Sequence, residues 1–359
     1  MKLFTLSTLS LVYITTISAT PSPRATCSKG RTATSGSCCV WYNVLDDIQA
    51  NLRVSFLFDG GICGEDAHDA LRLSFHDAIG YSPLLKSQRK VGGDGADGSL
   101  IMFASAELGY PANEGLEEIV HSEKRFADKW GVSIQLAAAG SVRNCAGGPR
   151  ISFLAGRPSA THASPVDLVT EAFDSVDKIL ARVQDAGLTP QELVDLLASH
   201  SIGLQDTVDP TISGTPFDTT PSVFDTKFYL ETLLHGTVWP GDGAHPSEAM
   251  SPFEGELRLQ SDAALAQYPR TSCYWSGFVN NQNPMASRFA TSMAKLALLG
   301  QNPHILQDCS EVIPPPTLPN PPAATLPKGT TLELTVLQFV IILNFLCLLL
   351  PGQIAKLHF

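Results

Sequence analysis

Helical patterns dominate the sequence between about residues 40 and 310, and they restrict the fold more than any other feature. Apolar residues recur at helical spacing in long segments, whereas long runs of alternating apolar and polar residues are scarce. Loops rich in glycine, proline, aspartate and threonine separate these segments. The sequence therefore predicts a mainly α fold, with helices over 41–52, 65–78, 115–130, 165–186, 190–201 and 284–299.

The first residues have the pattern of a secretory signal peptide. Lys2 is followed by a mostly apolar run through Ile17 and then by small residues. Arg24 would end a short pro-segment, so residues 1–25 are left out of the expected fold. A secreted chain matures in an oxidising compartment, where its eight cysteines are expected to form disulfides. Spacing alone does not fix which cysteines pair.

The charge of the chain excludes one class of partner. The sequence has 24 Lys and Arg against 35 Asp and Glu, a formal net charge of −11. No basic surface for nucleic acid is expected from such a balance. The hydrophobic fraction of 44% is sufficient for a folded core.

The C-terminal part differs in composition from the rest. Residues 313–335 begin with a proline-rich stretch that predicts an extended linker. Residues 336–350 are apolar apart from Gln338 and Asn344, but this run is shorter than the about 20 residues of a spanning helix. A marginal membrane anchor, a cleaved lipid-anchor signal and a gene-model error such as a translated intron are the alternatives. We favour the gene-model error for residues 336–359, so membrane attachment is not expected.

One face of the predicted helix 65–78 carries four polar side chains in a stripe. Their spacings of four, three and four residues place them one above the other. A solvated charged face is the ordinary explanation of such a stripe. Apolar residues at 71, 73 and 75 flank it, however, so its C-terminal half is a candidate lining of an internal cavity. The stripe consists of Glu65, Asp69, Arg72 and His76.

A second histidine ends the predicted helix 190–201. Thr189 and Glu192 form a capping-box pattern around Pro190, which fixes the start of the helix. His200 shares an apolar face with leucines at 193, 196 and 197. A histidine in that setting is more often a core residue than a ligand. As a metal ligand, it would need a carboxylate or carbonyl partner for its other ring nitrogen.

These two histidines belong to a series of motifs that occur in a fixed order. The motifs are RLSFHD at 72–77, GADGS at 95–99, LASHS at 197–201, FDTTP at 217–221, FD at 224–225 and QSD at 260–262. The series resembles that of the secreted fungal haem peroxidases of class II, which include manganese, lignin and versatile peroxidases. The resemblance extends from about Thr26 to Val312. It implies a monomeric enzyme with haem b between a distal domain, 26–164, and a proximal domain, 165–312.

The resemblance assigns a role to each residue on the distal side of the haem. His76 matches the base that moves a proton between the two oxygens of hydrogen peroxide, and Arg72 matches the group that stabilises charge on the departing oxygen. Asn113 matches the residue that orients the histidine. Glu107 matches the acid that holds this asparagine in place.

On the proximal side, His200 matches the iron ligand. Asp262 matches the carboxylate that accepts the other N–H of this imidazole and gives it anionic character. Phe75 and Phe217 match the aromatic residues that pack against the haem.

Two calcium sites follow from the same resemblance, each next to one of the two histidines. Side-chain and backbone oxygens in loops rich in glycine and aspartate are suitable ligands for this ion. The distal site would use Asp77, Gly95, Asp97 and Ser99. The proximal site would use Ser201, Asp218, Thr220, Val223 and Asp225.

The subfamily depends on two further positions. Glu65, Asp69 and Asp206 match the three carboxylates with which manganese-oxidising members bind Mn²⁺, although Asp69 is one methylene shorter than the usual glutamate. The alternative is that Asp206 caps a turn and that the other two acids are simply exposed. Lignin and versatile peroxidases carry an exposed tryptophan five residues before the proximal histidine, and Asp195 occupies that position here.

The resemblance also implies the disulfides Cys27–Cys39, Cys38–Cys309 and Cys63–Cys145. Cys273 would then pair with a cysteine of the C-terminal tail, for which Cys347 is a doubtful substitute. The expected function is oxidation of Mn²⁺ and/or small lignin-type phenols by hydrogen peroxide. A generic phenol-oxidising peroxidase without a working Mn²⁺ site is the alternative.

Overall fold

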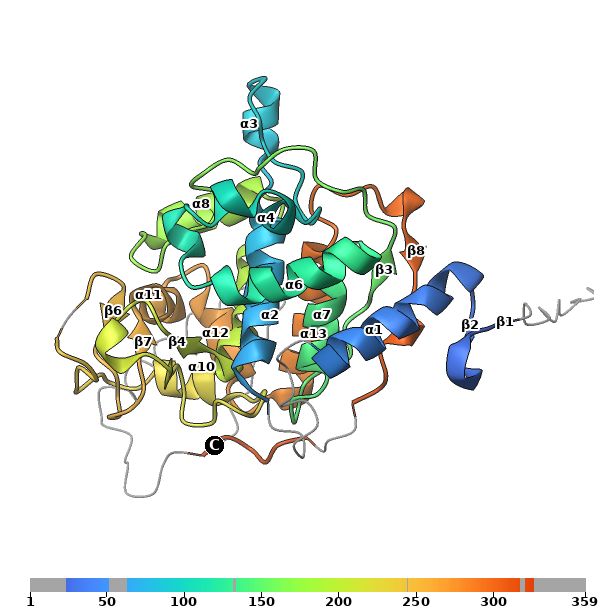
Figure 1. The fold of residues 1–359 in the computed structure, drawn as a ribbon. Coiled ribbons are helices and arrows are strands. Elements are labelled where there is room, and N and C mark those ends of the chain that lie inside the picture. The colour runs from blue at the N-terminus through green and yellow to red at the C-terminus, as the bar shows by residue number, and fades with distance from the viewer. Residues whose placement is uncertain (1–23, 52–62, 132–133, 244, 317–319, 326–359) are drawn as a thin grey trace, which may run out of the picture.

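A computed structural model describes residues 24–51, 63–131, 134–243, 245–316 and 320–325 of the chain (Figure 1). Helices make up most of its regular structure, so the predicted mainly α fold is confirmed. The longer helices are α1 (Cys39–Asn51), α2 (Glu65–Ile79), α6 (Glu117–Trp130), α7 (Ile134–Val142), α8 (Val176–Asp185), α9 (Pro190–Leu196), α11 (Gln260–Gln267), α12 (Ser272–Phe278) and α13 (Gln282–Leu296).

Shorter elements complete the structure. Four short α-helices are α3 (Pro83–Ser87), α4 (Ser99–Met102), α5 (Ala104–Glu107) and α10 (Lys227–Thr232). The strands described are two residues long and pair only as antiparallel ladders. The pairs are β1 (Ala25–Thr26) with β2 (Thr32–Ala33), β3 (Leu154–Ala155) with β8 (Gln307–Asp308), β4 (Leu204–Gln205) with β5 (Thr215–Pro216), and β6 (Glu248–Ala249) with β7 (Arg258–Leu259).

Helix α2 runs through the middle of the molecule beside α7 and α13 (Figure 1). Its small buried residues, Ala67, Ala70 and Ala78, allow α7 to approach closely. Every residue of α7 is buried, which agrees with its apolar composition on all sides. The core therefore fixes α2 along its whole length, and with it the stripe that carries Arg72 and His76.

Two predicted helices differ from those observed. The helix predicted over 165–186 begins only at Val176, where the Ser175 hydroxyl caps it by accepting from the Lys178 N–H at 3.3 Å. Residues 165–175 are irregular, and Asp167 has a φ of 66°. The helix predicted over 190–201 is divided into α9, which has the predicted capping box, and the 3₁₀ helix η5 (Leu197–Ile202).

The proline-rich segment after residue 313 packs against the protein. Its described residues form no helix or strand. Ile313 and Ala324 are nevertheless buried in the core, and Asn320 Nδ2 donates to Asn283 Oδ1 at 2.8 Å. The described part of this segment therefore belongs to the folded body and does not form a free linker.

Disulfides join the three cysteine pairs that the resemblance implied: Cys27–Cys39, Cys38–Cys309 and Cys63–Cys145. Cys273 is also disulfide-bonded, but Cys347, the partner considered for it, lies outside the described residues. Residues 1–23 of the predicted signal peptide and pro-segment (1–25) and the apolar run over 336–350 lie outside them too, whereas Ala25 is part of β1. In the part of the chain that is described, no helix is long and apolar enough to cross a bilayer.

Candidate active site

One cavity of about 440 Å³ brings the two predicted histidines together. His76, from α2, and His200, from η5, both line it. Apolar side chains from α8, α9 and α11 line the same cavity, as do both predicted aromatic residues, Phe75 and Phe217. An apolar cavity with a few convergent polar groups is the usual form of a cofactor or substrate site.

Asn113 fixes the tautomer of the distal histidine, His76. Its Nδ2 donates to the backbone carbonyl of Glu107 at 2.9 Å, which turns its Oδ1 toward His76 Nδ1 at 2.8 Å. Since this oxygen can only accept, Nδ1 carries the proton and Nε2 keeps a free lone pair. Burial, together with the charge of Arg72, lowers the pKa of His76 to about 3. The imidazole is therefore neutral and can act as a proton acceptor.

Glu107 holds Asn113 through its backbone. Its backbone carbonyl accepts from Asn113, whereas its carboxylate accepts from the backbone N–H of Ser164 at 2.9 Å. The predicted pairing of Glu107 with Asn113 is therefore present, through the backbone carbonyl of Glu107. The carboxylate connects the end of α5 to the loop before α8, and this connection places the Glu107 carbonyl.

Arg72 lies one turn before His76 on α2 and lines the cavity. Its Nη2 donates to the backbone carbonyl of Glu114 at 2.6 Å. A side chain at Gly115 would approach the Arg72 guanidinium to 3.2 Å, and Gly115 has a φ of +84°, so this position favours glycine. The backbone after η4 (Pro111–Asn113) thus orients the guanidinium and leaves other N–H groups for a ligand.

Asp262 fixes the tautomer of the proximal histidine, His200. His200 Nδ1 lies 2.9 Å from Asp262 Oδ2, and this carboxylate is almost completely buried at the start of α11. Because a carboxylate accepts, Nδ1 carries the proton and Nε2 is the nitrogen available as a ligand. The other carboxylate oxygen, Oδ1, is buried without a hydrogen-bond partner.

The structure adds two residues to this site that the sequence analysis did not select. Phe228 of α10 packs edge-on against His200, with ring centroids 5.4 Å apart, comparable to the 5.2 Å of Phe217. His68 of α2 lines the cavity and is buried, and burial lowers its pKa to about 3. His68 precedes Arg72 by four residues, so helical spacing could have identified it. No sequence signal marked Phe228.

The residues of the predicted distal calcium site converge behind His76. Asp77 Oδ2 accepts from the Gly98 N–H at 3.0 Å, and Asp97 Oδ1 accepts from the Ser99 N–H at 3.0 Å. Gly95 has a φ of +74°, which favours glycine. Burial raises the pKa of Asp77, as does Asp97, and burial raises the pKa of Asp97 to about 6. Two buried carboxylates under mutual repulsion suit a hard cation.

The predicted proximal calcium site has the same character. Asp218 Oδ1 accepts from the Thr220 N–H at 2.7 Å, and its buried Oδ2 has no hydrogen-bond partner. Thr220 Oγ1 donates to Asp225 Oδ2 at 3.0 Å. Burial raises the pKa of Asp218, with a further contribution from Asp225. Ser201 is buried beside His200, and the Val223 N–H donates to the Thr220 carbonyl at 2.9 Å.

Two of the three acids predicted to bind Mn²⁺ flank Arg72. The charges of Asp69 and Asp206 both act on its guanidinium. Asp206 lines the cavity, and its Oδ1 accepts from Ser213 Oγ at 2.6 Å and from the Gly214 N–H at 3.0 Å. Asp206 thus also caps a turn, which was the alternative interpretation.

The three acids are not gathered as ligands of one ion. Glu65 is exposed in the first turn of α2. In the described part of the chain, three acidic or histidine side chains meet with their ligand atoms within 4.8 Å of one another at one place. That group does not include Glu65, Asp69 or Asp206.

Asp195 occupies the position of the tryptophan found in lignin and versatile peroxidases, and it is buried. Its two oxygens accept from Arg288 Nε at 3.1 Å and from Ser292 Oγ at 2.8 Å. This ion pair joins α9 to α13. The position therefore has a structural role in this chain and presents no oxidisable side chain to the solvent.

The donor set around the cavity fits a haem. A histidine whose other nitrogen is held by a carboxylate is the usual iron ligand of peroxidases. A neutral histidine and an arginine, both held by backbone or amide groups, line the same cavity. Apolar side chains provide the remaining surface that a porphyrin requires.

Comparisons with known proteins agree with this geometry. Residues 46–281 match the family "Peroxidase", and residues 284–335 match the "Fungal peroxidase extension region". The chain is 50% identical over 311 residues to versatile peroxidase VPS1 of Pleurotus eryngii, covering 85% of this chain and 82% of the relative. For ligninase LG6 of Phanerodontia chrysosporium the identity is 48% over 316 residues, covering 86% and 84%. For manganese peroxidase 3 of Phlebia radiata it is 46% over 335 residues, covering 91% and 90%. The chain therefore belongs to the fungal class II peroxidases, the haem peroxidase family of the lignin, manganese and versatile enzymes.

Proposed function

We propose that this peroxidase uses hydrogen peroxide to oxidise Mn²⁺ and/or small lignin-type phenols in one-electron steps, as a secreted enzyme with haem b and two calcium ions. One observation carries the proposal: a single apolar cavity is lined by a neutral histidine held by Asn113 and by a second histidine held by Asp262. A bound haem supplies the reduction of peroxide and the stepwise oxidation of the reducing substrate.

Each side chain of the site would have a separate role in the reaction with peroxide. His200 would hold the iron through Nε2, while Asp262 keeps this imidazole electron-rich. His76 Nε2 would accept a proton from the peroxide and return it to the departing oxygen, so that the oxygen leaves as water. The Arg72 guanidinium would stabilise negative charge on that oxygen before the proton arrives. Phe75 and Phe217 would pack against the porphyrin.

The calcium ions would hold the loops behind the two histidines. Asp77 follows His76 and Ser201 follows His200, so each ion would fix the backbone next to one histidine. The buried carboxylates at 77, 97, 218 and 225 support this assignment, because their pKa values are all raised and a cation would compensate their charge.

Absorbance spectroscopy of the haem-reconstituted chain tests the proposal. A Soret band that changes on addition of hydrogen peroxide and is restored by Mn²⁺ supports Mn²⁺ oxidation. Restoration by a phenol alone favours the generic peroxidase without a working Mn²⁺ site. Absence of a haem band contradicts the proposal.

The substitution Asp206→Asn tests the Mn²⁺ assignment. Asparagine keeps an oxygen for the Ser213 and Gly214 hydrogen bonds but removes the charge, so the turn is retained. We expect the KM for Mn²⁺ to rise about tenfold or more, because ligand charge sets the affinity of such sites, whereas phenol oxidation is unchanged. Steady-state kinetics with each substrate measures both.

Glu114→Gln is the matched control, since Glu114 is an exposed acid that also lines the cavity but is not one of the three. Equal KM values for Mn²⁺ in Asp206→Asn, Glu114→Gln and the wild type would place Mn²⁺ elsewhere.

A further inference from the structure

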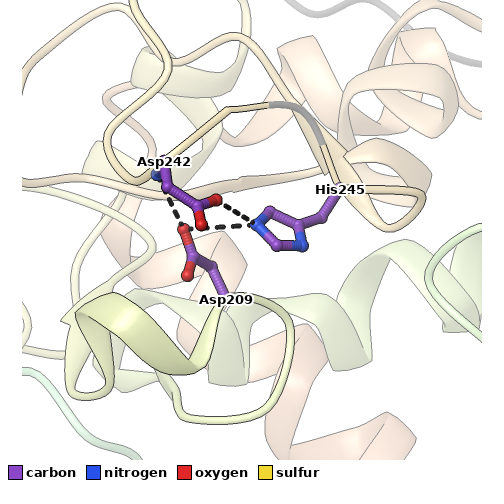
Figure 2. A group of neighbouring side chains, drawn as sticks. All are labelled: Asp209, Asp242 and His245. Atoms are coloured by element: carbon purple, nitrogen blue, oxygen red, sulfur yellow. Dashed lines mark hydrogen bonds and ion pairs between the residues drawn. The ribbon is translucent and has the colours of Figure 1, made fainter.

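A second cluster of titratable side chains lies beside the cavity, outside the peroxidase site. A carboxylate oxygen of Asp209, a carboxylate oxygen of Asp242 and a ring nitrogen of His245 lie within 4.8 Å of one another (Figure 2). His245 Nε2 lies 2.9 Å from Asp242 Oδ1 and 3.4 Å from Asp209 Oδ2. One imidazole nitrogen therefore faces two carboxylates.

Asp209 belongs to the loop between β4 and β5. It is completely buried, its Oδ1 accepts from the Thr211 N–H at 2.9 Å and from Thr211 Oγ1 at 2.6 Å, and its own N–H donates to Gln205 Oε1 at 3.0 Å. Residues 204–208 of the same loop line the cavity, and they include Asp206. Asp209 is therefore fixed to the cavity edge.

Asp242 and His245 come from the segment that leads into β6. A side chain at Gly241 would overlap Asp209 Oδ2, so only glycine allows this segment to lie so close to the loop. Ser247, two residues after His245, lines the cavity, and its backbone carbonyl accepts from the Gln260 N–H at 2.8 Å at the start of α11. Both segments that meet at His245 thus continue into the cavity lining.

The charges around His245 favour its protonated form. The groups that face it are Asp242 of its own segment, Asp209 of the β4–β5 loop and Glu248 of β6, whose Oε2 accepts the His245 backbone N–H at 3.4 Å. The hydrogen bond to Asp242 and the attraction of these carboxylates raise the pKa of His245. Hydrogen bonds from Thr211 keep the pKa of Asp209 below its ordinary value, so Asp209 remains an anion.

We propose that His245 is a positioning residue which, when protonated, joins the β4–β5 loop to the segment before β6 and so fixes one edge of the cavity that His76 and His200 line. Both carboxylates face the same ring nitrogen, Nε2, and Thr211 satisfies the remaining oxygen of Asp209, so the positive charge of the protonated ring is what holds the two anions together. The contribution of His245 is complete below the ordinary pKa of histidine and is lost as the pH rises through its raised value.

Amide hydrogen exchange of the haem-reconstituted full chain tests this role without reference to any reducing substrate. Exchange is compared at about pH 5 and about pH 8, on either side of the histidine range, after correction for the intrinsic rate. We expect residues 204–216 of the wild type to exchange about threefold faster at the higher pH. In His245→Gln these residues should exchange fast at both values. His235→Gln, at an exposed histidine ahead of the same segment, should behave as the wild type.

Two results would overturn the proposal: exchange in 204–216 that does not depend on pH in the wild type, and a His245→Gln variant that keeps the wild-type pH dependence. Asp242→Asn is a second variant at an exposed position. It removes one of the two carboxylates and should move the midpoint of the exchange transition to lower pH. An unmoved midpoint also contradicts the proposal.

The consequence for catalysis rests on the proposed Mn²⁺ oxidation, because Asp206 lies in the loop that His245 holds. The KM for Mn²⁺ should rise across the same pH range in the wild type but not in His245→Gln, while the rate constant for reaction with peroxide is the same in both. Absence of Mn²⁺ oxidation at any pH would refute the proposed reductant. The exchange experiment would still decide the role of His245.

Discussion

We expect His76→Gln to lower the rate constant for the reaction of the haem-reconstituted enzyme with hydrogen peroxide by about a thousandfold, the middle of the range for general acid–base catalysis. His76 is a neutral imidazole with a defined tautomer, because its Nδ1–H donates to Asn113 Oδ1 and Nε2 is left as the proton acceptor. Glutamine has a similar reach but cannot accept and return a proton. Stopped-flow absorbance at the Soret band measures the rate constant.

His68→Gln is a matched control for this substitution. His68 lies on the same helix, lines the same cavity and has a similarly lowered pKa, but in the described part of the chain its ring makes no hydrogen bond that would orient it. We expect its rate constant to stay within about threefold of the wild type. If both substitutions lowered the rate equally, the effect would come from the cavity and not from proton transfer at His76.

Asn113→Leu should give an intermediate result. The apolar side chain removes the group that fixes the His76 tautomer but leaves the imidazole in place. We expect a loss of about tenfold to a hundredfold, the usual effect of removing a partner that orients a functional histidine. A variant as slow as His76→Gln would mean that Asn113 has a role of its own.

The sequence predicted local features of the candidate site from residue spacing. The stripe on α2 follows from helical periodicity, and the capping box at Thr189 and Glu192 was found as predicted. Partners far apart in the chain could not be found in this way. His76 and Asn113 are 37 residues apart, and His200 and Asp262 are 62 apart. Only the resemblance to the peroxidase family predicted these pairs, because no spacing rule connects them.

The features that the sequence did not predict have physical reasons. Residues 165–175 have a helix-compatible composition, but tertiary contacts hold part of the stretch at the cavity edge, where Glu171 and Phe173 line it. Glu107 acts through its backbone carbonyl, and a backbone role leaves no trace in residue type. The cluster of Asp209, Asp242 and His245 forms only when two loops meet, so neither loop indicated it alone.

We expect removal of calcium to lower the thermal stability of the protein strongly. A bound ligand stabilises the folded state in proportion to the logarithm of its concentration divided by Kd. One calcium site at a calcium concentration about a thousand times its Kd therefore contributes roughly 4 kcal/mol to the free energy of unfolding. For a folded chain of roughly 300 residues that corresponds to a fall in Tm of about 6 °C for one site, and of about 12 °C when both sites are emptied by chelation. Differential scanning calorimetry with and without a chelator measures it, and metal analysis should give two calcium ions per chain in the untreated protein.

The effect of Asp97→Asn on stability should change sign between the calcium-loaded and the calcium-free protein. With calcium present, the variant lacks one anionic ligand and should be less stable than the wild type. Without calcium, the wild type buries Asp97 beside Asp77, each without compensation, and the neutral asparagine removes that repulsion. The variant should then be at least as stable as the wild type. Asp94→Asn, at a partly exposed acid of the same loop paired with Lys86, should follow the wild type with calcium present and show only a smaller gain without it, because the charge of Asp94 also raises the pKa of Asp97.

The calcium-free proteins should also differ in their response to pH. The pKa of Asp97 is raised to about 6 by burial, so the folded chain binds a proton that the unfolded chain has lost. Since the folded state then carries more protons, stability must rise as the pH falls through about 6, the opposite of a carboxylate whose pKa is lowered in the folded state. Asp97→Asn has no such proton to bind, and its calcium-free stability should change less over the same range. If the two proteins had parallel Tm profiles in chelator, Asp97 would not carry the buried charge that a calcium ion is proposed to neutralise.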